Sequence, residues 1–513
     1  MQRAAAIQVI PAGVLIHQYR SRMRRTPVQW AGLATGIVVF ILLLTLDTPL
    51  KHHGEHGAQP ALAAAVASMM AIWWLTEALP IQITACVPLL LFPLLGVFGP
   101  DIGTNVAEAV LPYFDPYIFL FAGGMCIAAA MQQWDLHRRI ALTVMHVIGT
   151  DPRRLLFGFL AATAFISLWI SNTATAAMML PIGIAVIAQL EHQAGVSRLP
   201  SYGMAIMLSI AYGSNVGGIG TKIGTAPNAQ FSGFMEQAGV EISFLQFMAV
   251  GLPFVVMFLP VVWYALWRIG RRDGLRDTSG AGVVEHELAL LGRIKHQEMI
   301  VLGVFIATAT VWIAGKPLTG VVQGMLPGVK ISSAHVEGGV AVLAAILLLL
   351  WPTQGSRVLA VRSLRTVPWG TLLLLGGGFA MAAGIQQSGL SDWMGMQLLG
   401  VRELAPFMQV LVASIVTVGM SAVASNTATI AVMLNVLRTA VAPEIANTTL
   451  FAATIAASCD FALPAGTPPN AIVFGSGYVT IPQMARTGAI LDIAAAVLAA
   501  AWCWVIVRVV LGS

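Results

Sequence analysis

The chain has 513 residues, of which 58% are hydrophobic and only 10% are charged, and its mean hydropathy is +0.82. Soluble domains carry about 25% charged residues, so this composition excludes a soluble globular protein and predicts a chain embedded in lipid. The net charge of +5 does not indicate a nucleic-acid partner, because the basic residues lie between apolar runs, where they report topology. The four widely spaced cysteines predict neither a disulfide framework nor a zinc site.

Apolar runs recur along the chain from Trp30 to Val510. Backbone groups in lipid must be satisfied within their own segment, so these runs predict helices and an all-α polytopic membrane protein. Most runs have about the 20 residues that one crossing needs. In chain order, the expected segments are 29–47, 61–79, 82–98, 114–134, 155–190, 203–238, 245–267, 297–315, 338–352, 368–390, 406–440, 448–480 and 485–510.

Segments 155–190 and 406–440 are nearly twice the usual length, and each is interrupted near its middle by Ser-Asn-Thr. We interpret both as re-entrant hairpins that enter and leave the membrane on the same side, which predicts about 11 transmembrane helices. The alternative is two full crossings in each segment, which leaves only roughly 16 residues per helix.

The basic residues predict the orientation and the division of the chain. If the N-terminus is cytoplasmic, most of the 27 Lys and Arg residues lie on the cytoplasmic side of the membrane, as is typical of membrane proteins. We therefore expect a cytoplasmic segment over residues 1–28, a first half over 29–268, a cytoplasmic linker over 269–296 and a second half over 297–513. The expected location is a bacterial inner membrane.

The two halves repeat in sequence. Ser-Asn-Thr-Ala-Thr occurs at 171–175 and again at 425–429, and a Gly-Gly-containing block at 120–124 recurs at 374–378 with the same offset of 254. Gly-Thr-x-Pro-Asn occurs at 224–228 and at 466–470. Five expected spans separate the two Ser-Asn-Thr strings, and this odd number predicts that the second copy is inverted. Inverted repeats place a binding site near the midplane.

Each half thus supplies a hairpin tip and a broken helix. Gly and Pro interrupt a helix and free its carbonyls and amides, which lipid tolerates only where they line a cavity. Freed amides at helix N-termini suit an anion, and freed carbonyls suit Na⁺. Two facing clusters match a substrate with an anionic group at each end. Ser and Thr can instead join helices, but two inverted copies favour a binding site.

With these paired motifs and Trp-Trp-Leu-Thr-Glu-Ala-Leu-Pro at 73–80, the chain from Trp73 to about Thr487 resembles the divalent anion:sodium symporter family. That family carries dicarboxylates, tricarboxylates or sulfate. The resemblance implies a homodimer in the lipid bilayer that works by an elevator mechanism, with a scaffold domain and a moving transport domain. It also implies Na⁺ as the co-transported ion and no organic cofactor.

The resemblance also implies roles for individual residues. The substrate would be bound by Asn172, Thr173, Asn426, Thr427 and Pro468. One Na⁺ site would comprise Ser167, Ser171, Asn172 and Gly224. The inverted Na⁺ site would comprise Ser421, Ala424, Asn426 and Gly466, with Ala424 and Gly466 acting through their carbonyls.

Two charged residues near the breaks are candidates for coupling. Lys222 lies beside the proposed first Na⁺ site, and Asp460 is the repeat equivalent of Gly218. Ionisable groups within a membrane are expensive and usually functional. Lys222 has three interpretations: it replaces the charge of a Na⁺ ion, it pairs with Asp460, or it extends toward the membrane interface.

The expected function is Na⁺-coupled uptake of a small dicarboxylate such as succinate, malate or fumarate. The alternatives are a Na⁺-independent exchanger of dicarboxylates or tricarboxylates, a sulfate transporter and an ion channel. The sequence contains no Walker motif and no spacing of nucleophile and base, so we expect neither an ATP-driven pump nor an enzyme.

Overall fold

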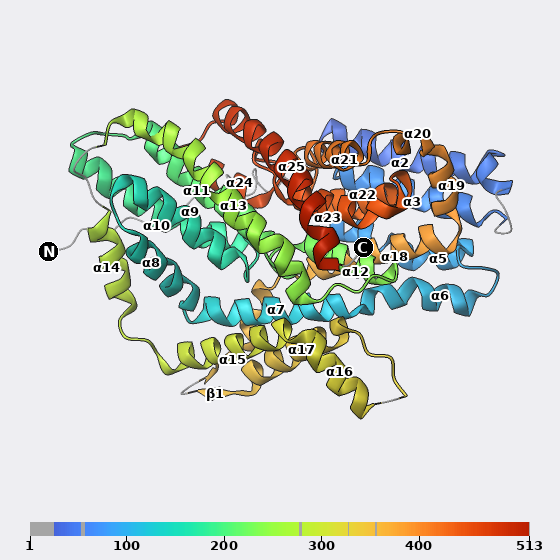
Figure 1. The fold of residues 1–513 in the computed structure, drawn as a ribbon, viewed down its shortest axis with the longest axis horizontal. Coiled ribbons are helices and arrows are strands. Elements are labelled where there is room, and N and C mark those ends of the chain that lie inside the picture. The colour runs from blue at the N-terminus through green and yellow to red at the C-terminus, as the bar shows by residue number, and fades with distance from the viewer. Residues whose placement is uncertain (1–24, 53–56, 276–279, 327, 354–355, 512–513) are drawn as a thin grey trace, which may run out of the picture.

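The computed structural model describes the chain except for residues 1–24, 53–56, 276–279, 327, 354–355 and 512–513 (Figure 1). The described residues are almost entirely helical, which confirms the all-α prediction. Their one pair of strands is a two-residue hairpin of β1 (Pro352–Thr353) and β2 (Ser356–Arg357).

A group of mostly short helices precedes the repeat. They are α2 (Pro27–Thr45), η1 (Pro49–His52), α3 (Gln59–Leu75), α4 (Ile81–Ala85), α5 (Val87–Leu95), α6 (Ile102–Val110) and η3 (Leu111–Phe114). Helix α2 begins at a capping box in which Thr26 and Gln29 exchange hydrogen bonds. Of the residues of α2, only Gly32 and Gly36 are buried, against Thr76 and Trp73 at the end of α3. Large apolar side chains on its other face, such as Ile37 and Ile41, are exposed.

The first half of the repeat comprises α7 (Pro116–Gln133), α8 (Leu136–Ile148), α9 (Pro152–Ser167), α10 (Asn172–Ala194), α11 (Pro200–Gly218), α12 (Ala226–Gln237) and α13 (Phe244–Gly270). The second half comprises α18 (Trp369–Gln387), α19 (Leu390–Gln397), α20 (Leu399–Arg402), α21 (Pro406–Ser421), α22 (Asn426–Ala440), η6 (Pro443–Ile445), α23 (Ala446–Ser458), α24 (Pro468–Phe474) and α25 (Ile481–Leu511).

The helix ends follow the sequence repeat closely. Helices α9 and α21 begin and end at equivalent residues with the offset of 254, and α10 and α22 begin at the equivalent asparagines. Helices α12 and α24 begin at equivalent residues with the offset of 242. The predicted hairpins and broken helices are therefore present as helix–turn–helix and helix–break–helix units.

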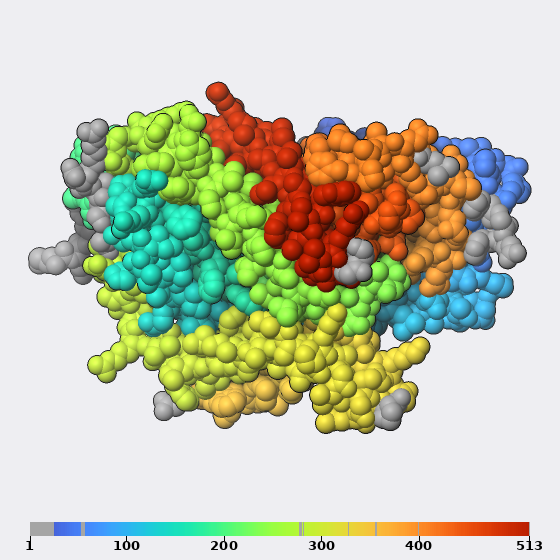
Figure 2. Space-filling model, in the orientation of Figure 1, coloured from blue at the N-terminus to red at the C-terminus, as the bar shows by residue number. Residues whose placement is uncertain are grey.

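Between the two repeat units, α7–α13 and α18–α25, lie η4 (Arg271–Asp273), α14 (Ala281–Leu291), α15 (His296–Ile313), α16 (Gly315–Met325), α17 (Ser333–Leu350) and η5 (Val361–Thr366). Helix α14 lies in the expected linker and packs against α8, where Arg138 pairs with Glu287. Helices α15–α17 form a layer beneath α7, seen as a continuous yellow edge in Figure 2.

The two halves exchange the helices that follow their breaks. Helix α24 of the second half packs against α10 and α11, and α12 of the first half packs against α22 and α23. Figure 1 shows α24 beside α9–α11, and α12 beside α22 and α18. The hairpins and breaks of both halves thus form one interlocked body.

Among the described residues, eight helices are long and apolar enough to cross a membrane. The expected count of about 11 also includes α3 and the α4–α5 pair, which are shorter, and both broken helices. Helix α10 is one of the eight helices that are long enough to cross a membrane, although it is one arm of a hairpin. Length alone therefore does not distinguish a re-entrant arm from a transmembrane helix.

Candidate functional site at the hairpin tips and helix breaks

The tip of the first hairpin is held by a bond between its two arms. Ser167 ends α9, and its Oγ donates to Oδ1 of Asn172, the first residue of α10, at 2.8 Å. Ser167 is fully buried and Asn172 is 8% exposed. The N-cap residue, Ser171, makes no side-chain cap, which leaves first-turn amides of α10 without that partner.

The tip of the second hairpin repeats this arrangement. Ser421 ends α21, and its Oγ lies 2.9 Å from Oδ1 of Asn426 and 2.7 Å from the carbonyl oxygen of Ala457. Asn426 is also 8% exposed, and Ser425 likewise makes no side-chain cap. Ala424 lies buried in the turn. The same pair of side chains therefore organises both tips.

The first break is folded around Asn228. Its Nδ2 donates to the carbonyl oxygens of Gly218 at 2.9 Å and Thr221 at 2.7 Å, which closes the loop between α11 and α12. A β-carbon on Gly224 would lie 2.4 Å from the Gly218 carbonyl oxygen, and one on Gly218 would lie 2.3 Å from Oδ1 of Asn172. Only glycines fit there, and they bring the break against the hairpin tip.

The second break is folded in the same way around Asn470. Its Nδ2 donates to the carbonyl oxygens of Asp460 at 3.1 Å and Leu463 at 3.0 Å, the equivalents of Gly218 and Thr221. A β-carbon on Gly466 would lie 1.9 Å from Oδ2 of Asp460. The two breaks thus share a backbone design but differ where Asp460 replaces a glycine.

Hydrogen bonds join the second break to α11 of the first half. Asn215 donates from Nδ2 to the carbonyl oxygen of Asp460 at 2.9 Å, and the Tyr212 hydroxyl donates to that of Phe461 at 3.0 Å. All of these residues are buried. Buried hydrogen bonds therefore connect the second break to a helix of the first half.

The residues assigned to the first Na⁺ site converge in the structure. Ser167 contacts Asn172, Asn172 faces Gly218, and Gly218 faces Gly224. In the second site, Ser421 contacts Asn426, and Gly466 lies against Asp460. Among the residues assigned to substrate, Thr173 and Pro468 are exposed at the first turns of α10 and α24, and Thr427 is partly exposed.

The pairing of Lys222 with Asp460 is wrong. Lys222 Nζ lies 2.7 Å from Oε2 of Glu337 in α17, and both side chains are fully buried. Nζ also lies 5.0 Å from the centre of the Tyr117 ring, a cation–π contact. Oε1 of Glu337 accepts a hydrogen bond from the Phe244 amide at 2.8 Å.

This ion pair decides two further questions about Lys222. Its full burial excludes the interpretation in which the side chain extends to the membrane interface. Glu337 neutralises the ammonium, so Lys222 does not present an unpaired positive charge to the first Na⁺ site. Sequence reasoning missed Glu337 because the expected apolar segment began at residue 338; an acidic residue directly before Gly338 and Gly339 was the available signal.

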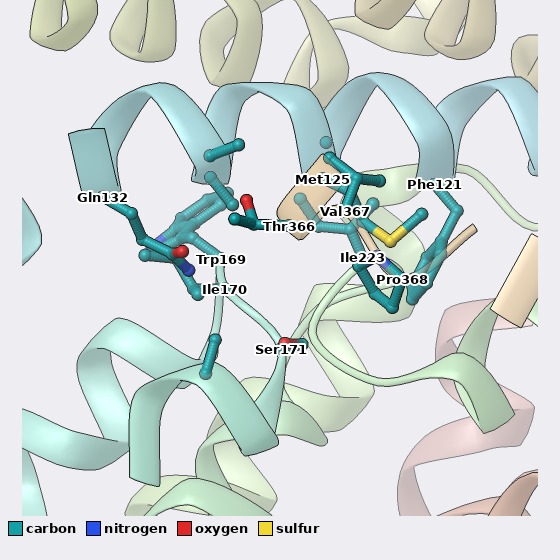
Figure 3. A pocket seen from close by; sticks show the side chains of 14 residues that line it. Phe121, Met125, Gln132, Trp169, Ile170, Ser171, Ile223, Thr366, Val367 and Pro368 are labelled. Atoms are coloured by element: carbon teal, nitrogen blue, oxygen red, sulfur yellow. The ribbon is translucent and has the colours of Figure 1, made fainter. Parts of the chain in front are cut away.

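A cavity of about 50 Å³ borders the first hairpin tip (Figure 3). Trp169, Ile170 and Ser171 of the tip face Phe121 and Met125 of α7 across it. Its remaining lining residues come from α7, from the tip, from the first break and from the segment before α18: Gly124, Ala128, Ala129, Gln132, Ala174, Ile223, Thr366, Val367 and Pro368. A cavity of this size is large enough for a few water molecules beside the tip.

Comparisons with known proteins agree on one family. Residues 28–510 match the family described as the sodium:sulfate symporter transmembrane region. Sodium-dependent dicarboxylate transporters SdcS of Staphylococcus aureus strains USA300 and NCTC 8325 are each 34% identical to this chain over 494 residues, covering 94% of it and 92% of the relative.

Two solved transporter structures share the fold at low sequence identity. The Alcanivorax borkumensis YdaH transporter superposes with a TM-score of 0.54 at 12% identity, covering 84% of this chain and 98% of its own. Neisseria gonorrhoeae MtrF, described as illuminating a class of antimetabolite efflux pumps, gives a TM-score of 0.53 at 14% identity, covering 84% and 97%. At these identities the likeness concerns the fold alone.

Proposed function

This chain belongs to the sodium:sulfate symporter family, and on that premise we propose that it takes up small dicarboxylates together with Na⁺. The observation that carries the proposal is a pair of matched clusters, one in each half. Each cluster combines a hairpin tip, where a serine contacts an asparagine, with a helix break that a second asparagine closes. The similarity to sodium-dependent dicarboxylate transporters supports the substrate class and the coupling ion. A family of transporters accounts for the chain without an enzymatic step.

Each tip binds one carboxylate of the substrate. Asn172 and Thr173 begin α10, and Asn426 and Thr427 begin α22, so their side chains and first-turn amides meet at the positive end of a helix dipole. Pro468 begins α24, and we assign it to the same substrate site. Two such ends match an anion with two charges.

Each cluster also holds one Na⁺. Hydroxyl, amide and carbonyl oxygens suit a hard cation. The first site comprises Ser167, Ser171, Asn172 and Gly224, and the second comprises Ser421, Ala424, Asn426 and Gly466. Asn172 and Asn426 belong to both a Na⁺ site and the substrate site, which couples the binding of the two.

The interlocked body of α9–α13 and α21–α25 is the part that moves. It carries both clusters, and the exchange of α12 and α24 between the halves supports its motion as one unit. The remaining helices form the scaffold of a homodimer in the bilayer. The two hairpins are re-entrant from opposite sides, and the halves are residues 29–268 and 297–513. We also assign residues 1–28 and the linker 269–296 to the cytoplasm, although residues 1–24 and 276–279 lie outside the described residues.

The test is uptake of radiolabelled succinate, citrate and sulfate into proteoliposomes under an inward Na⁺ gradient. Succinate should accumulate, and unlabelled malate and fumarate should compete with it, because both present two carboxylates. Accumulation of sulfate or citrate with no succinate uptake would reject the dicarboxylate assignment. Protein-free liposomes provide the background for each substrate.

A further inference from the structure

We propose that the carboxylate of Asp460 is a charged ligand of the cation at the second Na⁺ site. The inference rests on the proposed function for the identity of the ion. It makes the two Na⁺ sites unequal, because the first has a glycine at the equivalent position.

The sequence repeat shows that the backbone position of Asp460 is equivalent to that of Gly218. Asn228 bonds the carbonyls of residues 218 and 221, and Asn470 bonds those of the equivalent residues, 460 and 463. The backbones of the two breaks therefore correspond at this point. A β-carbon on Gly218 would lie 2.3 Å from Oδ1 of Asn172, so a side chain at this position points at the hairpin tip of its own half.

The carboxylate itself lies against a residue of the second site. A β-carbon on Gly466 would be 1.9 Å from Oδ2 and 2.7 Å from Oδ1 of Asp460. Gly466 is the repeat equivalent of Gly224, and its carbonyl belongs to the second Na⁺ site. In the first half the equivalent region is closed by the direct approach of Gly218 to Gly224 and Asn172, so only the second break carries a side chain at this position.

The Asp460 carboxylate has no partner among the described residues. The residue is 0% exposed, and neither Oδ1 nor Oδ2 makes a hydrogen bond in the described part of the chain. The buried ammonium of Lys222 is bound to Glu337 instead. Asp492, which accepts a hydrogen bond from the Phe461 amide at 2.9 Å, is a further acidic group nearby.

A cation bound beside Asp460 would compensate the charge of its carboxylate. Removing an ionised carboxylate from water without a partner is strongly unfavourable, and native proteins supply a hydrogen bond, a counter-charge or a metal ion. Asn215 Nδ2 and Asn470 Nδ2 donate to the backbone carbonyl of Asp460 and not to its carboxylate. In the proposed second site, the Ser421 hydroxyl and Oδ1 of Asn426 would supply further oxygen ligands. Oxygen donors with one negative charge favour a hard monovalent cation over an anion or a soft metal.

The test compares Na⁺ binding by the purified full-length protein with that of Asp460→Asn. Binding of radioactive ²²Na⁺ is measured without substrate, with choline keeping ionic strength constant. Asp460→Asn keeps the shape and removes the charge, so affinity at the tighter site should fall about tenfold or more, since charge attraction at contact distance is large in a buried site. Asp460→Gly, which introduces the residue found at position 218, should bind Na⁺ as weakly as Asp460→Asn. It provides a second test if Asp460→Asn fails to fold.

Asp492→Asn is the matched control. It removes the same charge from a neighbouring buried acid whose carboxylate already has a hydrogen-bond partner, and it should retain near-native Na⁺ affinity. An equal loss of Na⁺ affinity in Asp460→Asn and Asp492→Asn would show that any nearby negative charge has this effect. That result would overturn the role of Asp460 as a ligand. Native Na⁺ affinity in Asp460→Asn would also overturn it, and would mean that Asp460 carries a proton instead.

This result is separable from the proposed function. Na⁺-dependent succinate uptake with unchanged Na⁺ affinity in Asp460→Asn would leave the proposed function intact and reject the inference. Na⁺ binding that depends on Asp460, in a protein that does not transport dicarboxylates, would support the ligand role and reject the proposed substrate.

Discussion

Each hairpin tip presents one amide in a defined orientation. The hydroxyl of Ser167 donates to Oδ1 of Asn172. The Ser421 hydroxyl lies within hydrogen-bond distance of Oδ1 of Asn426 and shares its one proton with the Ala457 carbonyl oxygen. The bond fixes the amide plane and leaves the nitrogen, a donor only, on the opposite side. A donor held in this way favours an anion without the cost of ordering a free side chain.

Asn172→Ala and Asn426→Ala should each reduce dicarboxylate uptake to background while the protein remains monodisperse in detergent. In the proposed function, each variant loses a substrate donor and a Na⁺ ligand at once. The matched control is Asn435→Ala in α22, because Asn435 is equally buried but donates to Ala431 of its own helix. Uptake near the wild-type rate in either tip variant would remove that asparagine from the site.

The Lys222–Glu337 pair should be a strongly coupled structural element. Glu337→Gln leaves a fully buried ammonium without its counter-charge, and we expect a loss of about 3–5 kcal/mol in unfolding free energy. Lys222→Met with Glu337→Gln removes both charges and should cost less than Glu337→Gln alone. The unfolding free energy of each variant is measured by titration with sodium dodecyl sulfate. The single variant Lys222→Met completes the double-mutant cycle. Additive losses would show that the two charges do not depend on each other.

The sequence was sufficient to place the Ser–Asn pairs and insufficient to assign partners to the charges. The sequence repeat predicts the positions of Asn172 and Asn426, because the equivalent helices α10 and α22 both begin at these asparagines. Lys222 and Asp460 both flank a break, but the direction in which a side chain leaves an irregular loop depends on its three-dimensional path. Lys222 leaves toward α17, whose Glu337 lies 115 residues further along the chain.

At the scale of elements, hydropathy predicts the long apolar helices and misses the short amphipathic ones. All thirteen expected apolar segments correspond to helices in the described structure. Helices α8, α14, α16 and α19 were not expected, because they are too short or too polar to register as spans. Helix α14 forms in the expected linker because it packs on α8 through Arg138 and Glu287, which a local pattern does not reveal.

Two adjacent glycines of α17 provide a test of helix packing. A β-carbon on Gly338 would lie 2.7 Å from the Pro116 carbonyl oxygen at the start of α7, whereas one on Gly339 meets nothing within 4 Å. Gly338→Ala should therefore destabilise the protein by about 1–3 kcal/mol. Gly339→Ala should be neutral or stabilising by up to about 1 kcal/mol, because alanine favours the helix. Equal effects on unfolding would contradict the close approach of α7 and α17.

At the scale of the whole molecule, the inverted repeat predicts opposite exposure of equivalent loops. Val196 follows the first hairpin and Leu404 precedes the second, and both are more than 40% exposed. In a background lacking the four native cysteines, Val196→Cys should react with an impermeant maleimide only from the cytoplasmic side. Leu404→Cys should react only from outside. Labelling of both from one side would contradict the inverted arrangement.

The coupling of anion uptake to Na⁺ is the central claim for the molecule. The neutralised Lys222 and the two complete clusters favour symport over exchange. The most direct measurement is the uptake of labelled succinate into anion-free proteoliposomes, with external Na⁺ or with choline in its place. Symport predicts accumulation in Na⁺ and only background uptake in choline. Uptake that requires internal dicarboxylate and is unchanged when choline replaces Na⁺ would contradict the account and identify the protein as an exchanger.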